Sequence, residues 1–161
     1  MNRRHFFGRT LATLVGAAGA FRFVPAHAQG PSPEKIVKTN AEWKKLLTPA
    51  QYHVLREEGT EAPHSSPLND EKRKGAFVCA ACELPLFDSR TKYDSGTGWP
   101  SFYDHIHGNV GTRLDFKIIY PRTEYHCARC GGHQGHVFED GPKPTGLRYC
   151  NNGVALKFVP A

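Results

Sequence analysis

The sequence has 161 residues, which is enough for one domain and leaves no comfortable room for a second. Its formal net charge is +6, but four of its arginines lie within the first 28 residues, where no acidic residue accompanies them. The rest of the chain has no Lys/Arg cluster with interleaved aromatic residues, so the charge gives no support to a nucleic-acid-binding function.

Residues 1–28 follow the order of a secretory signal: a basic start, an apolar stretch over residues 11–20, and the small-residue sequence AHA at residues 26–28. The apolar stretch falls short of the roughly twenty residues that span a bilayer. We therefore expect cleavage and no membrane contact afterwards, with an uncleaved anchor as the alternative. The opening NRRHFF resembles a twin-arginine signal, which exports folded proteins and predicts a periplasmic location. Residues 29–38, QGPSPEKIVK, are typical of a linker, which leaves residues 39–161 as the domain.

Two short helices are predicted at the start of this domain. In NAEWKKLL, residues 40–47, Asn40 is expected to cap a helix that has an acidic residue in its first turn and lysines further on. In the following TPAQ, Thr48 is the expected cap, with proline in the first helical position and glutamine completing a capping box. Gly59 is the expected end of the second helix.

After Gly59 the pattern changes to short apolar stretches rich in Phe, Val, Ile and Tyr, separated by Gly and Pro. This pattern indicates β-structure. Strands this short are weak by themselves, so a small domain built from them needs a further link. The predicted strands are Ala76–Cys79, Thr91–Tyr93, Leu114–Ile119, Tyr125–Cys127, His136–Phe138 and Ala155–Val159.

Four of the five cysteines could provide that link. They form two Cys-x-x-Cys motifs, which are typical of a closed, tetrahedral zinc site with four thiolates: Cys79, Cys82, Cys127 and Cys130. The motifs are far apart in the sequence, so zinc would join distant parts of one domain. The alternatives are two disulfides, favoured by an oxidising compartment, or one redox-active Cys-x-x-Cys. Disulfides within each motif would close only short loops and stabilise little.

The fifth cysteine, Cys150, has three possible roles: an inert buried thiol, a partner in a disulfide with another chain, or a reactive thiol. Its surroundings favour reactivity. Arg148 lies two residues before it, and a cation lowers the pKa of a thiol. A glycine-flanked pair, His133 and His136, could supply a proton near neutral pH.

Four segments closely resemble the methionine-R-sulfoxide reductases of the B type. They are CAACELPLF, KYDSGTGWPSF, RTEYHCARCGGHQGHVFEDGPKPTGLRYCNNG and ALKF. The resemblance extends over roughly residues 40–160, and the run GHVFEDGPKPTGLRYC is too long to match by chance.

The resemblance implies a mainly β fold of two antiparallel sheets, preceded by short helices and held by one structural zinc ion on the four paired cysteines. It also implies an enzyme that reduces methionine-R-sulfoxide, free or in oxidised proteins and peptides, to methionine. The implied partner is a thioredoxin-like protein or small thiol, and we expect a monomer.

The same resemblance implies roles for individual residues. Cys150 would be the nucleophile that becomes a sulfenic acid, and Arg148 would support its thiolate. Two histidines, His133 and His136, would protonate or bind the sulfoxide oxygen, while Asn152 would bind the sulfoxide region. The remaining implied positions are Trp99, as the wall that receives the substrate methyl group, and Phe102, which lines the pocket or only packs. Without the resemblance, Trp99 is more simply a core residue.

Two acidic residues, Asp115 and Glu124, could orient a histidine or merely pair with arginines. The chain departs from the family pattern at Thr97, where many members have a resolving cysteine, so an external thiol is expected to reduce Cys150. It departs again at Asn151, where an apolar residue is usual. The competing hypotheses are a non-catalytic zinc-ribbon binding module, a peroxidase that uses Cys150, and a structural zinc domain with an inert thiol.

Overall fold

The computed structural model describes residues 32–161, so the predicted signal and the first residues of the predicted linker lie outside the described residues. Within residues 32–161, no helix combines the length and apolar character needed to cross a bilayer. The helices are α1 (Asn40–Leu46) and α2 (Pro49–Glu57), with short 3-10 turns η1 (Pro67–Asn69), η2 (Ser89–Thr91) and η3 (Gly153–Ala155). The strands are β1 (Gly75–Cys79), β2 (Pro85–Asp88), β3 (Lys92–Tyr93), β4 (Ser101–Phe102), β5 (Val110–Asp115), β6 (Arg122–Cys127), β7 (His133–Phe138), β8 (Arg148–Asn151) and β9 (Leu156–Pro160).

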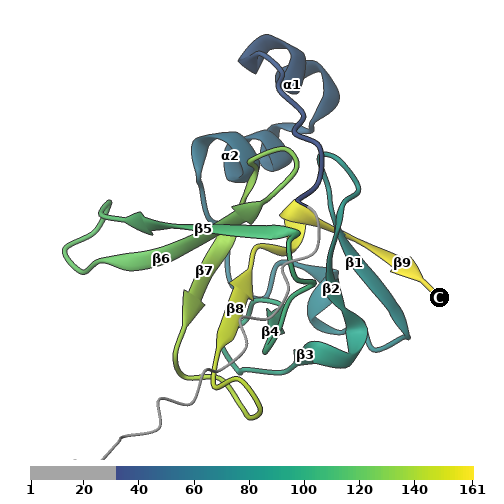
Figure 1. Ribbon diagram of the computed structural model, residues 1–161, viewed down its shortest axis with the longest axis vertical. Coiled ribbons are helices and arrows are strands. Elements are labelled where there is room, and N and C mark those ends of the chain that lie inside the picture. The colour runs from purple at the N-terminus through teal and green to yellow at the C-terminus, as the bar shows by residue number, and fades with distance from the viewer. Residues whose placement is uncertain (1–31) are drawn as a thin grey trace, which may run out of the picture.

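The strands form two antiparallel sheets, which confirms the predicted fold class (Figure 1). One sheet has three strands in the order β2-β1-β9, and the other has six in the order β3-β4-β8-β7-β6-β5. The hairpin of β5 and β6 extends away from the body of the molecule as an arm (Figure 1). Because β8 lies in the interior of the six-stranded sheet, it is supported by a neighbouring strand on each side.

Local sequence explains the two helices. Thr48 caps α2, Gln51 completes its capping box, and the chain leaves the helix at Glu58, which has a left-handed conformation with φ 55°. The first helix differs from the prediction in one respect: its cap is Thr39, one residue before the predicted Asn40. Thr39 forms a full capping box with Glu42, which supplies two reciprocal hydrogen bonds that an asparagine cap at position 40 would not form.

The strand predictions were incomplete. Strands β2, β4 and β8 were not predicted, and the predicted strand Leu114–Ile119 instead ends at Asp115. The Asp115 carboxylate accepts a hydrogen bond from the backbone N–H of Lys117, which turns the chain away from the ladder. The two-residue strand β4 has too little sequence for a periodic signal and is defined by pairing with β3 and β8.

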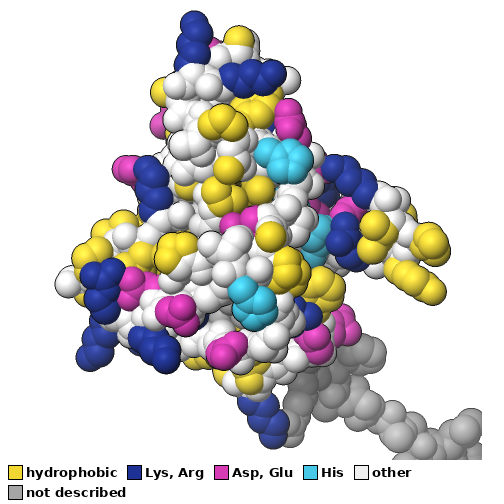
Figure 2. Space-filling view, turned by 180° about the vertical axis from the view of Figure 1, so that it is seen from behind, with side chains coloured by type: hydrophobic (Ala, Val, Ile, Leu, Met, Phe, Trp, Pro, Cys, Tyr) yellow, Lys and Arg dark blue, Asp and Glu magenta, His cyan; other side chains and the backbone are white. Residues whose placement is uncertain are grey.

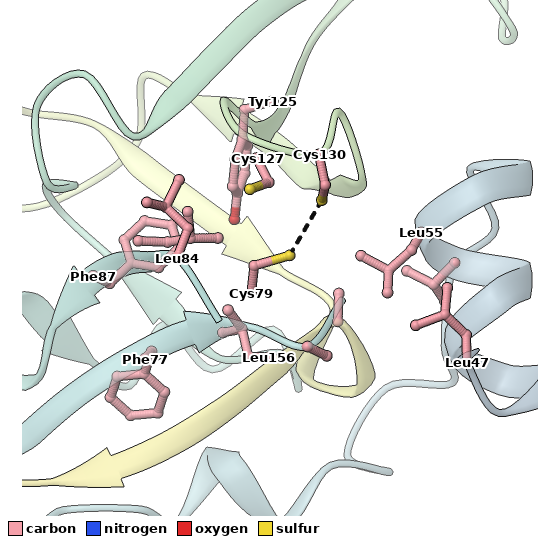
Figure 3. Close-up of a cluster of buried hydrophobic side chains, with 14 of the residues drawn as sticks. Leu47, Leu55, Phe77, Cys79, Leu84, Phe87, Tyr125, Cys127, Cys130 and Leu156 are labelled. Atoms are coloured by element: carbon pink, nitrogen blue, oxygen red, sulfur yellow. Dashed lines mark hydrogen bonds between the residues drawn. The ribbon is translucent and has the colours of Figure 1, made fainter. Parts of the chain in front are cut away.

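The core lies between the sheets and is rich in aromatic residues (Figure 3). Phe102 is fully buried and stacks on Phe87, with ring centroids 4.1 Å apart. Phe77 meets Phe102 edge-on at 4.9 Å. Leu55 brings α2 against the same cluster (Figure 3). Burial of these side chains provides most of the driving force that holds the two sheets and α2 together.

The predicted linker is not free where the structure describes it. The ammonium group of Lys35 donates a hydrogen bond to the carbonyl of Ala128 at 2.7 Å, and the backbone N–H of Ile36 donates one to the carbonyl of Arg129 at 2.9 Å. Ile36 is half-buried against the core cluster. The end of this segment therefore packs on the second cysteine motif, which the Pro-rich composition did not indicate.

Candidate active site

Cys150 lies on β8 with its side chain on the face of the six-stranded sheet opposite the core. Side chains alternate along a strand, so Cys150 shares its face with Arg148, while Tyr149 between them points into the core cluster. Across the ladder, Cys150 faces Ser101 of β4 and His136 of β7. Cross-strand partners have Cβ atoms about 4.5–5.5 Å apart, so the thiol and the imidazole are close neighbours.

A pocket of about 140 Å³ opens beside this thiol. Its lining combines a thiol, an imidazole, a guanidinium and aromatic rings: Thr60, Trp99, Arg122, Gly135, His136, Phe138, Cys150, Asn151 and Asn152. A larger cavity of about 520 Å³ lies beside α2, but no cysteine lines it. The smaller pocket is the candidate active site because the Cys150 thiol lines it together with an imidazole.

The environment of Cys150 has opposing effects on its thiol. Burial raises the pKa above its ordinary value, and this is the largest influence; the cation of Arg148 and hydrogen bonds from Thr97 and Arg148 lower it in part. The net pKa stays above the ordinary value, contrary to the expectation that a nearby arginine makes the free thiol acidic. Thr97 is itself held by Ser95, whose hydroxyl lies 2.8 Å from that of Thr97 and 2.7 Å from that of Ser101.

His136 is oriented by a carboxylate. Its Nε2 lies 2.7 Å from Oδ2 of Asp115, and Arg122 donates to the same oxygen at 2.7 Å. The pKa of Asp115 is well below its ordinary value. The largest cause is the hydrogen bond from the backbone N–H of Lys117, and hydrogen bonds from His136 and Arg122 lower the pKa further. Burial lowers the pKa of His136, although the bond with Asp115 opposes this. Asp115 thus orients a histidine and also pairs with an arginine, the two roles that the sequence left open.

His133 has a similar arrangement behind His136. Its Nδ1 lies 2.8 Å from Oε1 of the buried Glu124, and Arg113 pairs with the other carboxylate oxygen at 2.7 Å. Burial alone would raise the pKa of Glu124, but hydrogen bonds from His126 and His133 hold it at about 2. The His133 ring lies 5.5 Å from the His136 ring, and its buried Nε2 has no hydrogen-bond partner among the described residues.

Glu61 holds two walls of the pocket together, and the sequence did not identify it. Its carbonyl accepts from Nε1 of Trp99 at 3.1 Å, and its N–H donates to Oδ1 of Asn152 at 3.0 Å. Its carboxylate accepts from the N–H groups of Gly153 and Val154 at 2.5 and 2.9 Å. Only the position of Glu61 shortly after Gly59, the expected helix end, could have drawn attention to it, and that signal is weak.

Comparison with known proteins agrees with this geometry. A family model described as the SelR domain matches residues 47–160. The protein named peptide methionine sulfoxide reductase MsrB in Methanosarcina barkeri is 56% identical over 124 residues, which are 76% of this chain and 87% of that protein. The protein of the same name in Agrobacterium fabrum is 52% identical over 127 residues, 78% of this chain and 94% of that protein. The chain belongs to the peptide methionine sulfoxide reductase B family.

The structure of this MsrB family member brings together most of the predicted site residues. Cys150, His136, Trp99 and Asn152 line one pocket. The Asn152 side chain also has structural partners, since its amide nitrogen donates to the carbonyl of Gln134 at 3.0 Å.

Three predicted residues of the MsrB site lie outside the pocket lining. His133 is buried beside His136. Arg148 forms two hydrogen bonds of 2.8 Å with Asp140, and its cation lowers the pKa of Cys150. Phe102 is in the core, which is the packing alternative; it occupies the strand position next to Ser101, so its side chain points to the opposite face.

The paired cysteines of this MsrB chain form a cluster suited to zinc. The four sulfur atoms all lie within 4.8 Å of one another. The Sγ atoms of Cys79 and Cys130 are 3.7 Å apart, and those of Cys82 and Cys127 are 3.5 Å apart. A tetrahedral zinc ion with bonds of about 2.3 Å needs sulfur atoms roughly 3.8 Å apart, whereas a disulfide needs about 2.05 Å. The separations therefore fit a shared metal ion, and all four thiols are free.

Proposed function

We propose that this protein reduces methionine-R-sulfoxide to methionine with Cys150 as the nucleophile. The observation that carries the proposal is the placement of one thiol directly across the ladder from His136, in a pocket that Trp99 and Asn152 also line. Relatives named peptide methionine sulfoxide reductase support the substrate class. The zinc-ribbon module and the peroxidase explain less, because neither requires an aromatic wall and an oriented imidazole around the thiol.

In the proposed reaction, the Cys150 sulfur attacks the sulfoxide sulfur. The sulfoxide oxygen becomes basic as its bond to sulfur polarises, so it needs a proton donor. His136, held by Asp115, faces the thiol, and the His133 ring lies beside it with its Nδ1 against the carboxylate of Glu124. The oxygen then moves to the Cys150 sulfur as the substrate sulfur–oxygen bond and the new sulfur–sulfur bond break, which releases methionine and leaves Cys150 as a sulfenic acid. Trp99 gives the small methyl group an apolar contact, and Asn152 also lines the pocket.

The sulfenic acid is then reduced by an external thiol. The chain has five cysteines, and four of them form the cluster, so none remains to form a disulfide with Cys150. Two thiol groups of a thioredoxin-like protein or a small reductant would supply two electrons and two protons, releasing water and one disulfide. Thr97, which takes the place of a resolving cysteine in the resemblance, lowers the pKa of the Cys150 thiol instead.

We also propose that the four-cysteine cluster holds one structural zinc ion. Bound there, zinc would supply a closed four-thiolate link and no chemistry of its own. Gln134 donates to the sulfur of Cys79 at 3.5 Å, and Arg56 approaches that of Cys130 at 3.9 Å, so polar donors already surround these thiols. Export in folded form, expected from residues 1–28, would let zinc bind before the protein reaches an oxidising periplasm.

Epimer-resolved turnover tests the function. The zinc-loaded full chain is supplied with a peptide carrying racemic methionine sulfoxide and with dithiothreitol, and each epimer is followed by chromatography. We expect consumption of the R epimer only, abolished in Cys150→Ser. Consumption of neither epimer by a folded, zinc-loaded protein would contradict the proposal, as would equal consumption of both.

A further inference from the structure

The end of the β5–β6 hairpin exposes a group of large apolar side chains. We call the side chains of Phe116, Ile118, Ile119 and Tyr120 the apolar tip. Their exposed fractions are 69%, 49%, 93% and 75%. Figure 2 shows hydrophobic side chains gathered at the end of the projecting arm. A cluster of this kind on a projecting loop marks a contact surface more often than isolated exposed residues do.

The loop end of the two hairpin strands belongs to the candidate active site. Asp115, the last residue of β5, bonds His136, and Arg122, the first residue of β6, lines the pocket. Arg122 also bonds Asp115 across the hairpin at 2.7 Å. The apolar tip therefore begins at the residue after Asp115, which orients the site. A molecule that contacts the tip is thus close to the group that enters the pocket.

The hairpin is also anchored to the body of the protein. Glu58, at the end of α2, forms ion pairs with Arg113 of β5 and with Lys117 in the tip loop. Arg113 pairs in addition with the buried Glu124 at 2.7 Å. These contacts fix the direction of the arm, so its apolar side chains project from the loop that leads directly to Arg122 in the pocket lining.

The size of the pocket indicates what these side chains contact. At about 140 Å³, the pocket is smaller than the roughly 300–1,000 Å³ typical of sites that enclose a whole small ligand. It has room for one side chain, so the rest of a polypeptide substrate must run across its rim. Arg122, at the loop end of the hairpin strands, helps to form that rim. Four tip side chains cannot provide the roughly 800 Å² per partner of a standard interface, which argues against a stable second copy.

We propose that the apolar tip binds apolar side chains that flank the oxidised methionine in unfolded or flexible polypeptides. The inference rests on the proposed function, since it assigns the substrate class of the same site. A folded protein buries both its methionines and their apolar neighbours, whereas an oxidised, locally unfolded segment exposes them together. The tip would favour that segment over free methionine sulfoxide.

Paired substrates test this inference. Phe116→Ser/Ile119→Ser removes two exposed side chains of the tip, and Val37→Ser/Leu46→Ser is the matched control, because those residues are 91% and 61% exposed on other parts of the chain. Each full-length, zinc-loaded protein is given N-acetylmethionine-R-sulfoxide or a decapeptide with leucines around the sulfoxide. We expect kcat/KM for the decapeptide to fall roughly 5–10-fold in the tip variant, with the small substrate unchanged and the control like wild type.

A binding measurement separates this inference from the proposed function. In the Cys150→Ser background, affinity for the same labelled decapeptide does not require turnover, and we expect the tip variant to bind it several-fold more weakly. Equal affinity, or an equal loss on both substrates, would overturn the inference even if the protein is a reductase. Concentration-dependent association of wild type that the tip variant loses would assign the tip to self-contact and overturn it as well.

Discussion

At the residue scale, the reactivity of Cys150 depends on a balance between burial and hydrogen bonding. Burial removes water from the thiolate and raises the pKa, while Arg148 and Thr97 stabilise the negative sulfur and lower it. Because burial is the larger effect, the thiolate fraction at neutral pH is smaller than that of a free cysteine. The reactivity of Cys150 in the free protein should therefore rise with pH through and beyond the ordinary thiol value of 9.0.

Replacing Thr97 tests this balance. Thr97→Val keeps the shape and removes the hydroxyl, so the pKa of Cys150 should rise further and its alkylation by iodoacetamide at about pH 8 should slow several-fold. Thr97→Ser retains the hydroxyl and should behave like wild type. Mass mapping of the Cys150 peptide over a pH series measures the rate separately from the clustered thiols. An alkylation profile that is the same for valine and serine would show that the hydroxyl has no effect on the thiol.

Asn151 illustrates how the opposite face of the same strand is stabilised. Its side chain is fully buried, and the hydroxyl of the equally buried Tyr125 donates to its Oδ1 at 2.7 Å. Its amide nitrogen donates to the carbonyl of Asn152 at 2.7 Å. The unusual polar residue beside the nucleophile is therefore tolerated because the core supplies hydrogen-bond partners for it.

Removal of both partners should cost less than the sum of the two single removals. Tyr125→Phe leaves a buried amide oxygen without a donor, and we expect the free energy of unfolding to fall by about 1–3 kcal/mol. Tyr125→Phe combined with Asn151→Val removes both polar groups and should cost less than the sum of the single changes. Urea unfolding of the four proteins measures the coupling. Strictly additive costs would show that the two side chains act independently.

At the element scale, the segment between α2 and η1 joins parts of the site that are far apart in the sequence. Glu61 contacts Trp99 and Asn152 through its backbone and η3 through its carboxylate. The carboxylate accepts hydrogen bonds from the N–H groups of Gly153 and Val154 at the start of η3, shortly after the strand that carries Cys150. Its contacts therefore fix the distance between the aromatic wall and the end of β8.

Glu61→Gln should loosen this arrangement. The amide has one acceptor oxygen where the carboxylate has two, so one N–H of η3 loses its partner, at a cost of about 1–2 kcal/mol in unfolding free energy. We expect KM for a sulfoxide peptide to rise several-fold with a smaller change in kcat, because the binding walls move and the thiol does not. Glu83→Gln, at a side chain that is 73% exposed, is the control. A loss of stability without any change in KM would limit Glu61 to a structural role.

At the scale of the whole molecule, the cysteine cluster joins the two sheets. Cys79 ends β1, and Cys82 lies in the turn that leads to β2. Cys127 ends β6, and Cys130 lies in the turn before β7. One pair therefore belongs to the three-stranded sheet and the other to the six-stranded sheet, so a metal ion shared by all four would fix one sheet on the other.

Metal removal should destabilise the whole domain. A structural four-thiolate zinc ion contributes its binding energy to folding, and we expect a chelator to lower the free energy of unfolding by on the order of 5 kcal/mol or more. Thermal unfolding by circular dichroism, with zinc content measured in parallel, checks this, and Cys82→Ser should have a smaller effect in the same direction. An unchanged melting temperature after complete metal removal, or two disulfides found by mass mapping, would contradict the prediction.

The sequence by itself determined the features that depend on neighbouring residues. The Thr48 cap with its proline and glutamine specified α2, and the two Cys-x-x-Cys motifs specified the metal-type cluster. The motif around Cys150 indicated the nucleophile and the family. These signals are readable because capping hydrogen bonds, motif spacing and thiol chemistry operate over a few residues.

Only the tertiary structure decided which distant residues meet at the site. Asp115 and His136 are 21 positions apart, and Glu61 and Asn152 are 91 apart. Their contacts depend on the register of strands and on loops that no local pattern encodes. Strand alternation likewise placed Phe102 in the core, although its neighbours in sequence lie near the thiol. The chemistry was readable from residue types, but its geometry required the packing of two sheets around one aromatic core, since long-range pairing sets which side of each strand faces the pocket.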